Sequence, residues 1–212
     1  GEVALKSGQF TRHFQSTAAA RMATNLPNLL TLSRIAAIPA MIALFWVPSP
    51  LGNWLAFAVF VAAALTDLLD GWLARRWQLV SALGRFLDPI ADKLLVAAAL
   101  LMLGASNGIE GFTVLPAIVI LCREILVSGL REFLAELKVR VPVSALAKWK
   151  TTIQMVAIAV LLVGDAGPAA LPVRLIGEIG LWAAAALTMV TGYDYLRAGL
   201  IHLTDSNPPA SP

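Results

Sequence analysis

The sequence predicts an all-α, polytopic membrane protein with six transmembrane helices around a polar cavity that faces the cytoplasm. Three observations lead to this prediction. Hydrophobic residues make up 58% of the 212 residues and charged residues only 14%, whereas a soluble domain has roughly 45–50% and about 25%. Six stretches are long and apolar enough to cross a bilayer. Most of the basic residues lie on one side of these stretches.

The six stretches set the expected organisation of the chain. A helix needs about 20 mainly apolar residues to cross the roughly 30 Å of a bilayer core. We expect such helices at residues 29–47, 54–76, 86–105, 112–136, 145–164 and 173–198. The remaining chain is predicted to form a polar arm (1–22) and a short tail (201–212), which flank a six-helix domain (23–200). The arm lacks the apolar core of a secretory signal.

Lysine and arginine are distributed unequally between the two ends of the spans. Twelve of them lie on the side that carries both termini, and Arg174 alone lies on the other. Cytoplasmic loops of membrane proteins carry an excess of Lys and Arg. Both termini are therefore predicted to be cytoplasmic.

Several classes of protein are disfavoured by the residues that the chain lacks. Cys122 is the only cysteine, and His13 and His202 lie near opposite ends, so neither an internal disulfide nor a Cys/His zinc site is expected. The sequence contains no Gly-x4-Gly-Lys phosphate loop and no dinucleotide fingerprint. Its basic residues cap the spans and form no stripe, so no nucleic-acid partner is expected.

Four aspartates lie in the second and third expected spans, where an acid is costly. They are Asp67, Asp70, Asp88 and Asp92. One aspartate at the centre of a transmembrane helix costs about 2.5–3.5 kcal/mol on insertion scales. The first two are three residues apart and the last two are four apart, so each pair shares one helix face. The short connection makes the two helices antiparallel neighbours, and the two pairs can therefore converge in a polar cavity.

A group made only of carboxylates suits hard cations such as Mg²⁺ or Mn²⁺. Three interpretations are open: metal-assisted phosphoryl chemistry, a cation-coupling site of a small transporter, and a structural network of ion pairs. The basic neighbours for such a network are Arg75, Arg76, Arg85 and Lys93. Gly71, Ala74 and Gly84 favour the first interpretation, because small residues let a bulky ligand approach the backbone.

Residues 67–92 read Asp-x2-Asp-Gly-x2-Ala-Arg-x8-Gly-x3-Asp-x3-Asp, with eight defined positions in 26 residues. This pattern resembles the signature of the CDP-alcohol phosphatidyltransferase family, without departure at any position. Segments 25–34, 123–136 and 148–154 extend the resemblance to approximately residues 24–198. Within the family, these segments are most similar to bacterial enzymes whose acceptor is sn-glycerol 3-phosphate.

The resemblance implies a reaction in which the 1-hydroxyl of sn-glycerol 3-phosphate attacks the β-phosphorus of CDP-diacylglycerol and releases CMP. It also implies two divalent ions, Mg²⁺ or Mn²⁺, and a homodimer in the bacterial cytoplasmic membrane with the active site facing the cytoplasm. The same chemistry with another acceptor (inositol phosphate, serine or phosphatidylglycerol) stays open, as does a cation-coupled transporter.

The resemblance also implies roles for individual residues. The metal ligands would be Asp67, Asp70, Asp88 and Asp92, of which Asp88 and Asp92 are catalytic. Asp92 would be the general base that the acceptor hydroxyl requires. Residues binding CDP-diacylglycerol would be Asn28, Thr31, Gly71, Ala74, Arg75 and Gly84.

An anionic acceptor requires fixed positive charge, and arginine suits bidentate recognition of phosphate. The candidates are Arg34, Lys93, Arg123, Arg131, Lys148 and Lys150. A structural alternative is that the last two anchor the helix end at the membrane surface. Another is that Glu124 pairs with Arg131, because Glu124, Ser128 and Arg131 share one helical face.

Overall fold

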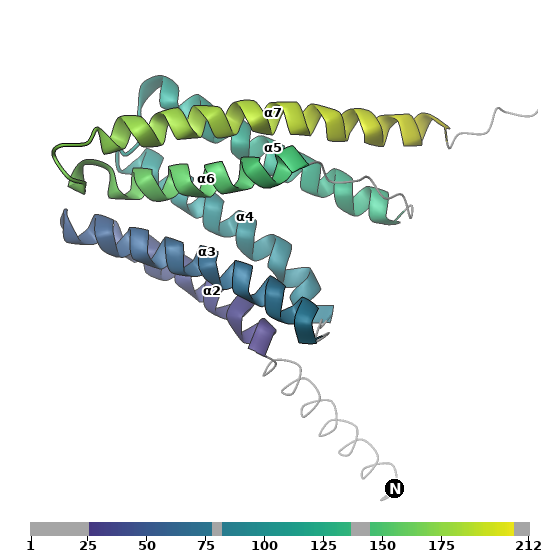
Figure 1. Cartoon of the computed structure of the whole chain (residues 1–212), viewed down its shortest axis with the longest axis horizontal. Helices are drawn as coiled ribbons and strands as arrows, with labels where there is room; N and C mark the ends of the chain where they lie inside the picture. Colours follow the sequence, from purple (N-terminus) through teal and green to yellow (C-terminus); the bar gives the residue numbers. More distant parts are fainter. Residues whose placement is uncertain (1–25, 78–81, 137–144, 206–212) are drawn as a thin grey trace, which may run out of the picture. The chain divides into compact units, whose positions relative to one another are not determined.

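The computed structural model describes residues 26–77, 82–136 and 145–205, without the side chains of 26–28, 70–77, 82–86, 145, 147–148, 198 and 200–205. The regular structure in these ranges is helical throughout (Figure 1). Its long helices are α2 (Leu26–Leu44), α3 (Leu51–Trp77), α4 (Ala82–Ala105), α5 (Val114–Glu136), α6 (Ala145–Val163) and α7 (Val173–Asp205). Single 3-10 turns, η1 (Gly111–Thr113) and η2 (Gly164–Ala166), precede α5 and follow α6. The predicted all-α class is confirmed.

Four stretches of the described chain are long and apolar enough to cross a membrane. They are Leu51–Leu69, Gly111–Glu136, Trp149–Ala166 and Val173–Arg197. The most apolar window of each is only 22–44% buried within the chain, which leaves most of its apolar surface to lipid. A soluble protein rarely exposes so much contiguous apolar surface. The prediction of a polytopic membrane protein is therefore confirmed.

The two other expected spans are less apolar or shorter than these four. The apolar part of α2 runs from Leu29 to Leu44. Helix α4 carries Asp88, Asp92 and Lys93 in its first half. Charged residues in a membrane helix are costly and mark functional positions, so the first half of α4 is a candidate for the site.

The chain forms two compact units. Among the described residues, the first contains those up to Met41 and those of Val59–Leu95, and the second contains Ile42–Ala58 and those from Val96 onward. In the first unit, Phe60 and Leu95 are buried apolar residues, but Thr31 and Arg34 of α2 are buried as well. A buried arginine requires charged or hydrogen-bonding partners, so the polar interior of this unit needs an explanation.

In the second unit, α7 packs against both α6 and α5. Two glycines of α7 allow a close approach to α6. A Cβ on Gly177 would lie 2.6 Å from Leu161 Cγ, and a Cβ on Gly180 would lie 3.0 Å from Ala157 Cβ. Small residues at helix interfaces are the usual way to pack membrane helices tightly.

Arg174, at the start of α7, has acidic partners in the neighbouring connections. Its guanidinium nitrogens lie 3.5 Å from Glu110 Oε1, 3.6 Å from Asp165 Oδ2 and 3.4 Å from Glu178 Oε1. Nη2 also donates to the carbonyl of Asn107 at 2.8 Å. The one cation on the sparsely charged side of the spans therefore joins the segments before α5 and after α6 to α7.

Candidate active site

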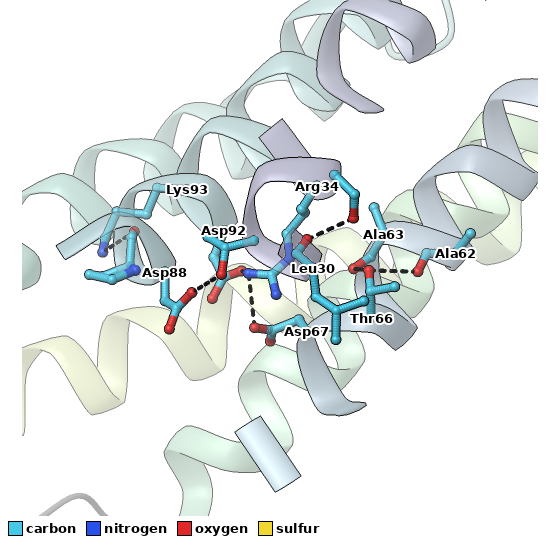
Figure 2. Close-up of polar contacts among 12 residues, drawn as sticks. Leu30, Arg34, Ala62, Ala63, Thr66, Asp67, Asp88, Asp92 and Lys93 are labelled. Atoms are coloured by element: carbon cyan, nitrogen blue, oxygen red, sulfur yellow. Dashed lines mark hydrogen bonds and ion pairs between the residues drawn. The ribbon is translucent and has the colours of Figure 1, made fainter. Parts of the chain in front are cut away.

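Arg34 of α2 lies at the centre of a charged group in the first unit (Figure 2). Its Nη1 is 3.0 Å from Asp67 Oδ1 on α3 and 2.7 Å from Asp92 Oδ1 on α4. The arginine side chain is 0% exposed, whereas the two carboxylates are 39% and 47% exposed. The acids therefore converge on one buried nitrogen while each keeps an accessible side.

Asp88 is held by the same helix. Thr31 Oγ1 donates a hydrogen bond to Asp88 Oδ1 at 2.6 Å. Thr31 and Arg34 are three residues apart, so they share one face of α2. This face of α2 binds acids from both α3 and α4, as the sequence pattern in 67–92 requires for one common site.

Arg34 and Lys93, both predicted to bind the acceptor phosphate, have protein partners in the structure. Arg34 binds the aspartates, and Lys93 Nζ donates to the carbonyl of Pro89 in its own helix at 3.0 Å. An Arg34–aspartate cluster was not predicted, because the basic partners expected for the acids lie in or beside the second and third spans, whereas Arg34 lies in the first. The available signal was the Thr-x2-Arg spacing, which places two polar side chains on one face of an apolar helix.

The described carboxylates fit part of a divalent-cation site. Asp67 and Asp92 both contact one nitrogen of Arg34, and Asp88 lies one helical turn before Asp92 on α4. These are hard oxygen donors of the kind that Mg²⁺ and Mn²⁺ prefer. Among the side chains that the structure describes, no three His, Cys, Asp or Glu residues form a complete metal-ligand group. The fourth predicted ligand, Asp70, is not among them.

Several other predicted site residues also have no described side chain. They are Asn28, Gly71, Ala74, Arg75, Gly84 and Lys148. Their assignment to CDP-diacylglycerol or to the acceptor phosphate stays a prediction.

A second charged group lies in the second unit, between α5, α6 and α7. Arg123 Nη1 lies 3.3 Å from Glu124 Oε1, and Lys150 Nζ bonds the same carboxylate oxygen. Arg123 Nη2 donates to Thr191 Oγ1 of α7 at 3.2 Å. Lys150 and Thr191 are buried. Two cations share one acid here, which leaves a net positive charge that suits an anionic ligand.

The structural alternative in which Glu124 pairs with Arg131 is not what the structure shows. The ion-pair partners of Glu124 among the described residues are Arg123 and Lys150. The Arg131 guanidinium lies instead over the ring of Tyr195, 5.8 Å from its centroid. A helical face allows a pair at a spacing of seven, but Arg123 on α5 and Lys150 on α6 are the residues that contact the Glu124 carboxylate.

Three buried polar atoms of this unit have no hydrogen-bond partner among the described residues. They are Arg123 Nε, Gln154 Oε1 and Thr188 Oγ1. Most buried polar groups in proteins are hydrogen-bonded, so an exception calls for a bound water or a ligand. Sequence reasoning did not single out Thr188 or Thr191, because a lone threonine in an apolar run carries no distinctive signal.

Comparison with known proteins identifies the family of this chain. The sequence profile of the CDP-alcohol phosphatidyltransferase family matches residues 24–190. A CDP-diacylglycerol–glycerol-3-phosphate 3-phosphatidyltransferase of Rickettsia bellii is 51% identical and aligns over 82% of this chain and 94% of its own. Proteins of the same name from Pseudomonas fluorescens and Cereibacter sphaeroides are 44% and 40% identical, over 84% and 85% of this chain and 92% and 98% of their own lengths. The chain therefore belongs to the CDP-alcohol phosphatidyltransferase family.

Proposed function

We propose that this protein transfers the phosphatidyl group of CDP-diacylglycerol to sn-glycerol 3-phosphate, forming phosphatidylglycerol phosphate and CMP. The observation that carries the proposal is the convergence of Asp67 and Asp92 on Arg34 Nη1, within the sequence signature of the family. The names of the relatives support the choice of both substrates. The excess of Lys and Arg on one side supports a site that faces the cytoplasm of the bacterial inner membrane.

Members of the family are generally dependent on a divalent metal. In this chain the ligands would be Asp67, Asp70, Asp88 and Asp92, and we propose two ions, Mg²⁺ or Mn²⁺. When bound, such ions neutralise charge on the diphosphate and stabilise the leaving phosphate. Arg34 and Thr31 hold three of these carboxylates in place from α2.

Asp92 is the proposed general base. Its carboxylate is 47% exposed and is oriented by Arg34 through one oxygen. The acceptor hydroxyl oxygen forms a bond to the β-phosphorus, while its proton passes to Asp92. The bond between the β-phosphorus and the oxygen that bridges to the α-phosphate breaks, and its electron pair leaves with CMP. Removal of the proton as the new bond forms is ordinary general-base catalysis.

Arg123 and Lys150 are the described residues best suited to bind the acceptor phosphate. Both are cationic and largely buried, and Arg123 Nε has no acceptor among the described residues. A buried donor without a partner costs roughly 1–3 kcal/mol, which an oxygen of a bound phosphate would recover. Arg131 and the undescribed Lys148 are further candidates, whereas the contacts of Arg34 favour positioning of the acids.

The remaining parts of the proposal are the binding of CDP-diacylglycerol and the oligomeric state of the protein. Asn28, Thr31, Gly71, Ala74, Arg75 and Gly84 would bind the CDP end of the donor, as the resemblance to the family implies. The two acyl chains of the donor can stay in the bilayer while its head group enters the site. We also propose that the protein acts as a homodimer.

Release of CMP from CDP-diacylglycerol with a panel of acceptors tests this function. We expect release with sn-glycerol 3-phosphate and little with inositol phosphate, serine or phosphatidylglycerol. A preference for another member of the panel would reassign the acceptor. Absence of CMP release with every acceptor, in protein that binds Mg²⁺, would favour a transporter.

A further inference from the structure

Two adjacent residues of α7 contact the side chain of Arg123. Arg123 Nη2 donates to Thr191 Oγ1 at 3.2 Å. The next residue, Gly192, has no side chain, and a Cβ built there would lie 3.1 Å from Arg123 Cγ and 3.2 Å from Nε. The stem of the arginine therefore lies directly against the backbone of α7.

Thr191 is itself fixed in orientation. Its hydroxyl lies 2.8 Å from the carbonyl oxygen of Leu187 and 3.3 Å from that of Thr188. A threonine hydroxyl has one proton to donate and two lone pairs. Because the proton is directed to a carbonyl of α7, the oxygen presents a lone pair to Arg123. Thr191 is thus an acceptor of defined direction for the guanidinium.

The other end of the guanidinium is also defined. Nη1 lies 3.3 Å from Glu124 Oε1, the oxygen that Lys150 also bonds. With Glu124 on one side and Thr191 on the other, the plane of the guanidinium is set. Nε is left as a buried donor without an acceptor among the described residues.

We propose that Thr191 and Gly192 are positioning residues that hold Arg123 in the orientation in which its Nε and terminal nitrogens bind the phosphate of the acceptor. Thr191 sets the direction of the guanidinium, and Gly192 provides the space for its stem beside α7. This inference rests on the proposed function, because Arg123 is there assigned to the acceptor phosphate. If Thr191 and Gly192 have this role, α7 contributes to the affinity for sn-glycerol 3-phosphate as well as α5 and α6.

Thr191→Val tests the first half of the proposal, since valine keeps the shape and removes the hydroxyl. We expect the KM for sn-glycerol 3-phosphate to rise about fivefold, less than for loss of Arg123 itself, because the variant loses the contact that orients the guanidinium but keeps its charge. The KM for CDP-diacylglycerol and kcat should change less than about twofold. Thr191→Ser, which keeps the hydroxyl, should restore the KM for sn-glycerol 3-phosphate.

Gly192→Ala tests the second half, with Gly129→Ala as the matched control. Both glycines are in helices, but a Cβ on Gly129 meets nothing within 4 Å. Gly192→Ala should raise the KM for sn-glycerol 3-phosphate, and Gly129→Ala should leave it unchanged. This pair also decides the proposal if Thr191→Val fails to fold.

A double-mutant comparison distinguishes this proposal from the proposed function. In an Arg123→Ala background, Thr191→Val should have no further effect on the KM for sn-glycerol 3-phosphate, because the two residues act through one contact. If Arg123→Ala raises this KM but Thr191→Val and Gly192→Ala do not, the role of Thr191 and Gly192 is wrong and the proposed function stands. If the wild type releases no CMP with sn-glycerol 3-phosphate, the proposed function fails first.

Discussion

Arg34 and Asp92 are 58 residues apart in the sequence, yet Arg34 Nη1 donates to Asp92 Oδ1 at 2.7 Å. The same nitrogen contacts Asp67, so one buried side chain links α2, α3 and α4. Removing one member of a buried ion pair leaves the other without compensation, which is costly. The first unit therefore depends on Arg34 for both its stability and the arrangement of its acids.

Arg34→Gln should destabilise the protein, because glutamine can donate a hydrogen bond but carries no charge. We expect a loss of about 1–3 kcal/mol, less than for a fully buried pair since both carboxylates are partly exposed. Thermal unfolding in detergent should show a melting temperature lower by roughly 2–12 °C, at about 2–4 °C per kcal/mol for a chain of this size. The exposed Arg197, changed to Gln, is the control and should shift it little. Equal melting temperatures for the two variants would contradict the role of Arg34.

Chelation of divalent metal should abolish CMP release, and added Mg²⁺ or Mn²⁺ should restore it. Asp88→Asn should lower the rate on the order of 100-fold or more, because a ligand of the ions that balance the diphosphate charge is lost. Mg²⁺ should also raise the melting temperature of the wild type, since a ligand that binds the folded state stabilises it. Asp88→Asn should reduce this shift.

The control for the metal experiment is Asp165→Asn, which removes an acid that is 82% exposed and is paired with Arg174. This variant should keep both CMP release and the Mg²⁺-dependent shift. Full activity of the wild type in excess chelator would refute the assignment of the aspartates to a metal.

Arg123→Ala should raise the KM for sn-glycerol 3-phosphate about 10- to 100-fold, since charge-assisted hydrogen bonds contribute roughly 1.5–3 kcal/mol each. The KM for CDP-diacylglycerol should change less than about twofold, because uniform binding of only one substrate is lost. Arg174→Ala, in the ion-pair group at the start of α7, is the matched control and should change neither KM. Equal rises in both KM values for Arg123→Ala would exclude an acceptor-specific role.

Gly177→Ala should weaken the packing of α7 against α6. The added Cβ would lie 2.6 Å from Leu161 Cγ and 3.2 Å from the Leu161 backbone nitrogen, so either the side chain or the helix must move. Overpacking of this kind costs typically about 1–3 kcal/mol. The melting temperature should fall for Gly177→Ala but not for Gly129→Ala, where there is room. A fall for both would point to a general effect of alanine in these helices.

The positions of most helices could be predicted from the lengths of the apolar stretches in the sequence. The ends of the fourth, fifth and sixth expected spans lie close to those of α5, α6 and the apolar part of α7. Such agreement is expected, because a bilayer imposes both a length and an apolar composition on each span. The first expected span began three residues later than α2, and α3 begins three residues earlier than expected. Helix ends depend on local capping and are the least predictable part of a helix.

The sequence by itself determined the helical membrane architecture and singled out the four aspartates. A charged residue in a membrane span is costly, so it can be recognised from residue type and spacing alone. It could not determine which cations the acids contact. Tertiary structure decided that Arg34 binds Asp67 and Asp92, and that Glu124 joins Arg123 and Lys150 instead of Arg131. These contacts cross between helices, and their partners depend on how each helix is rotated about its axis against its neighbours.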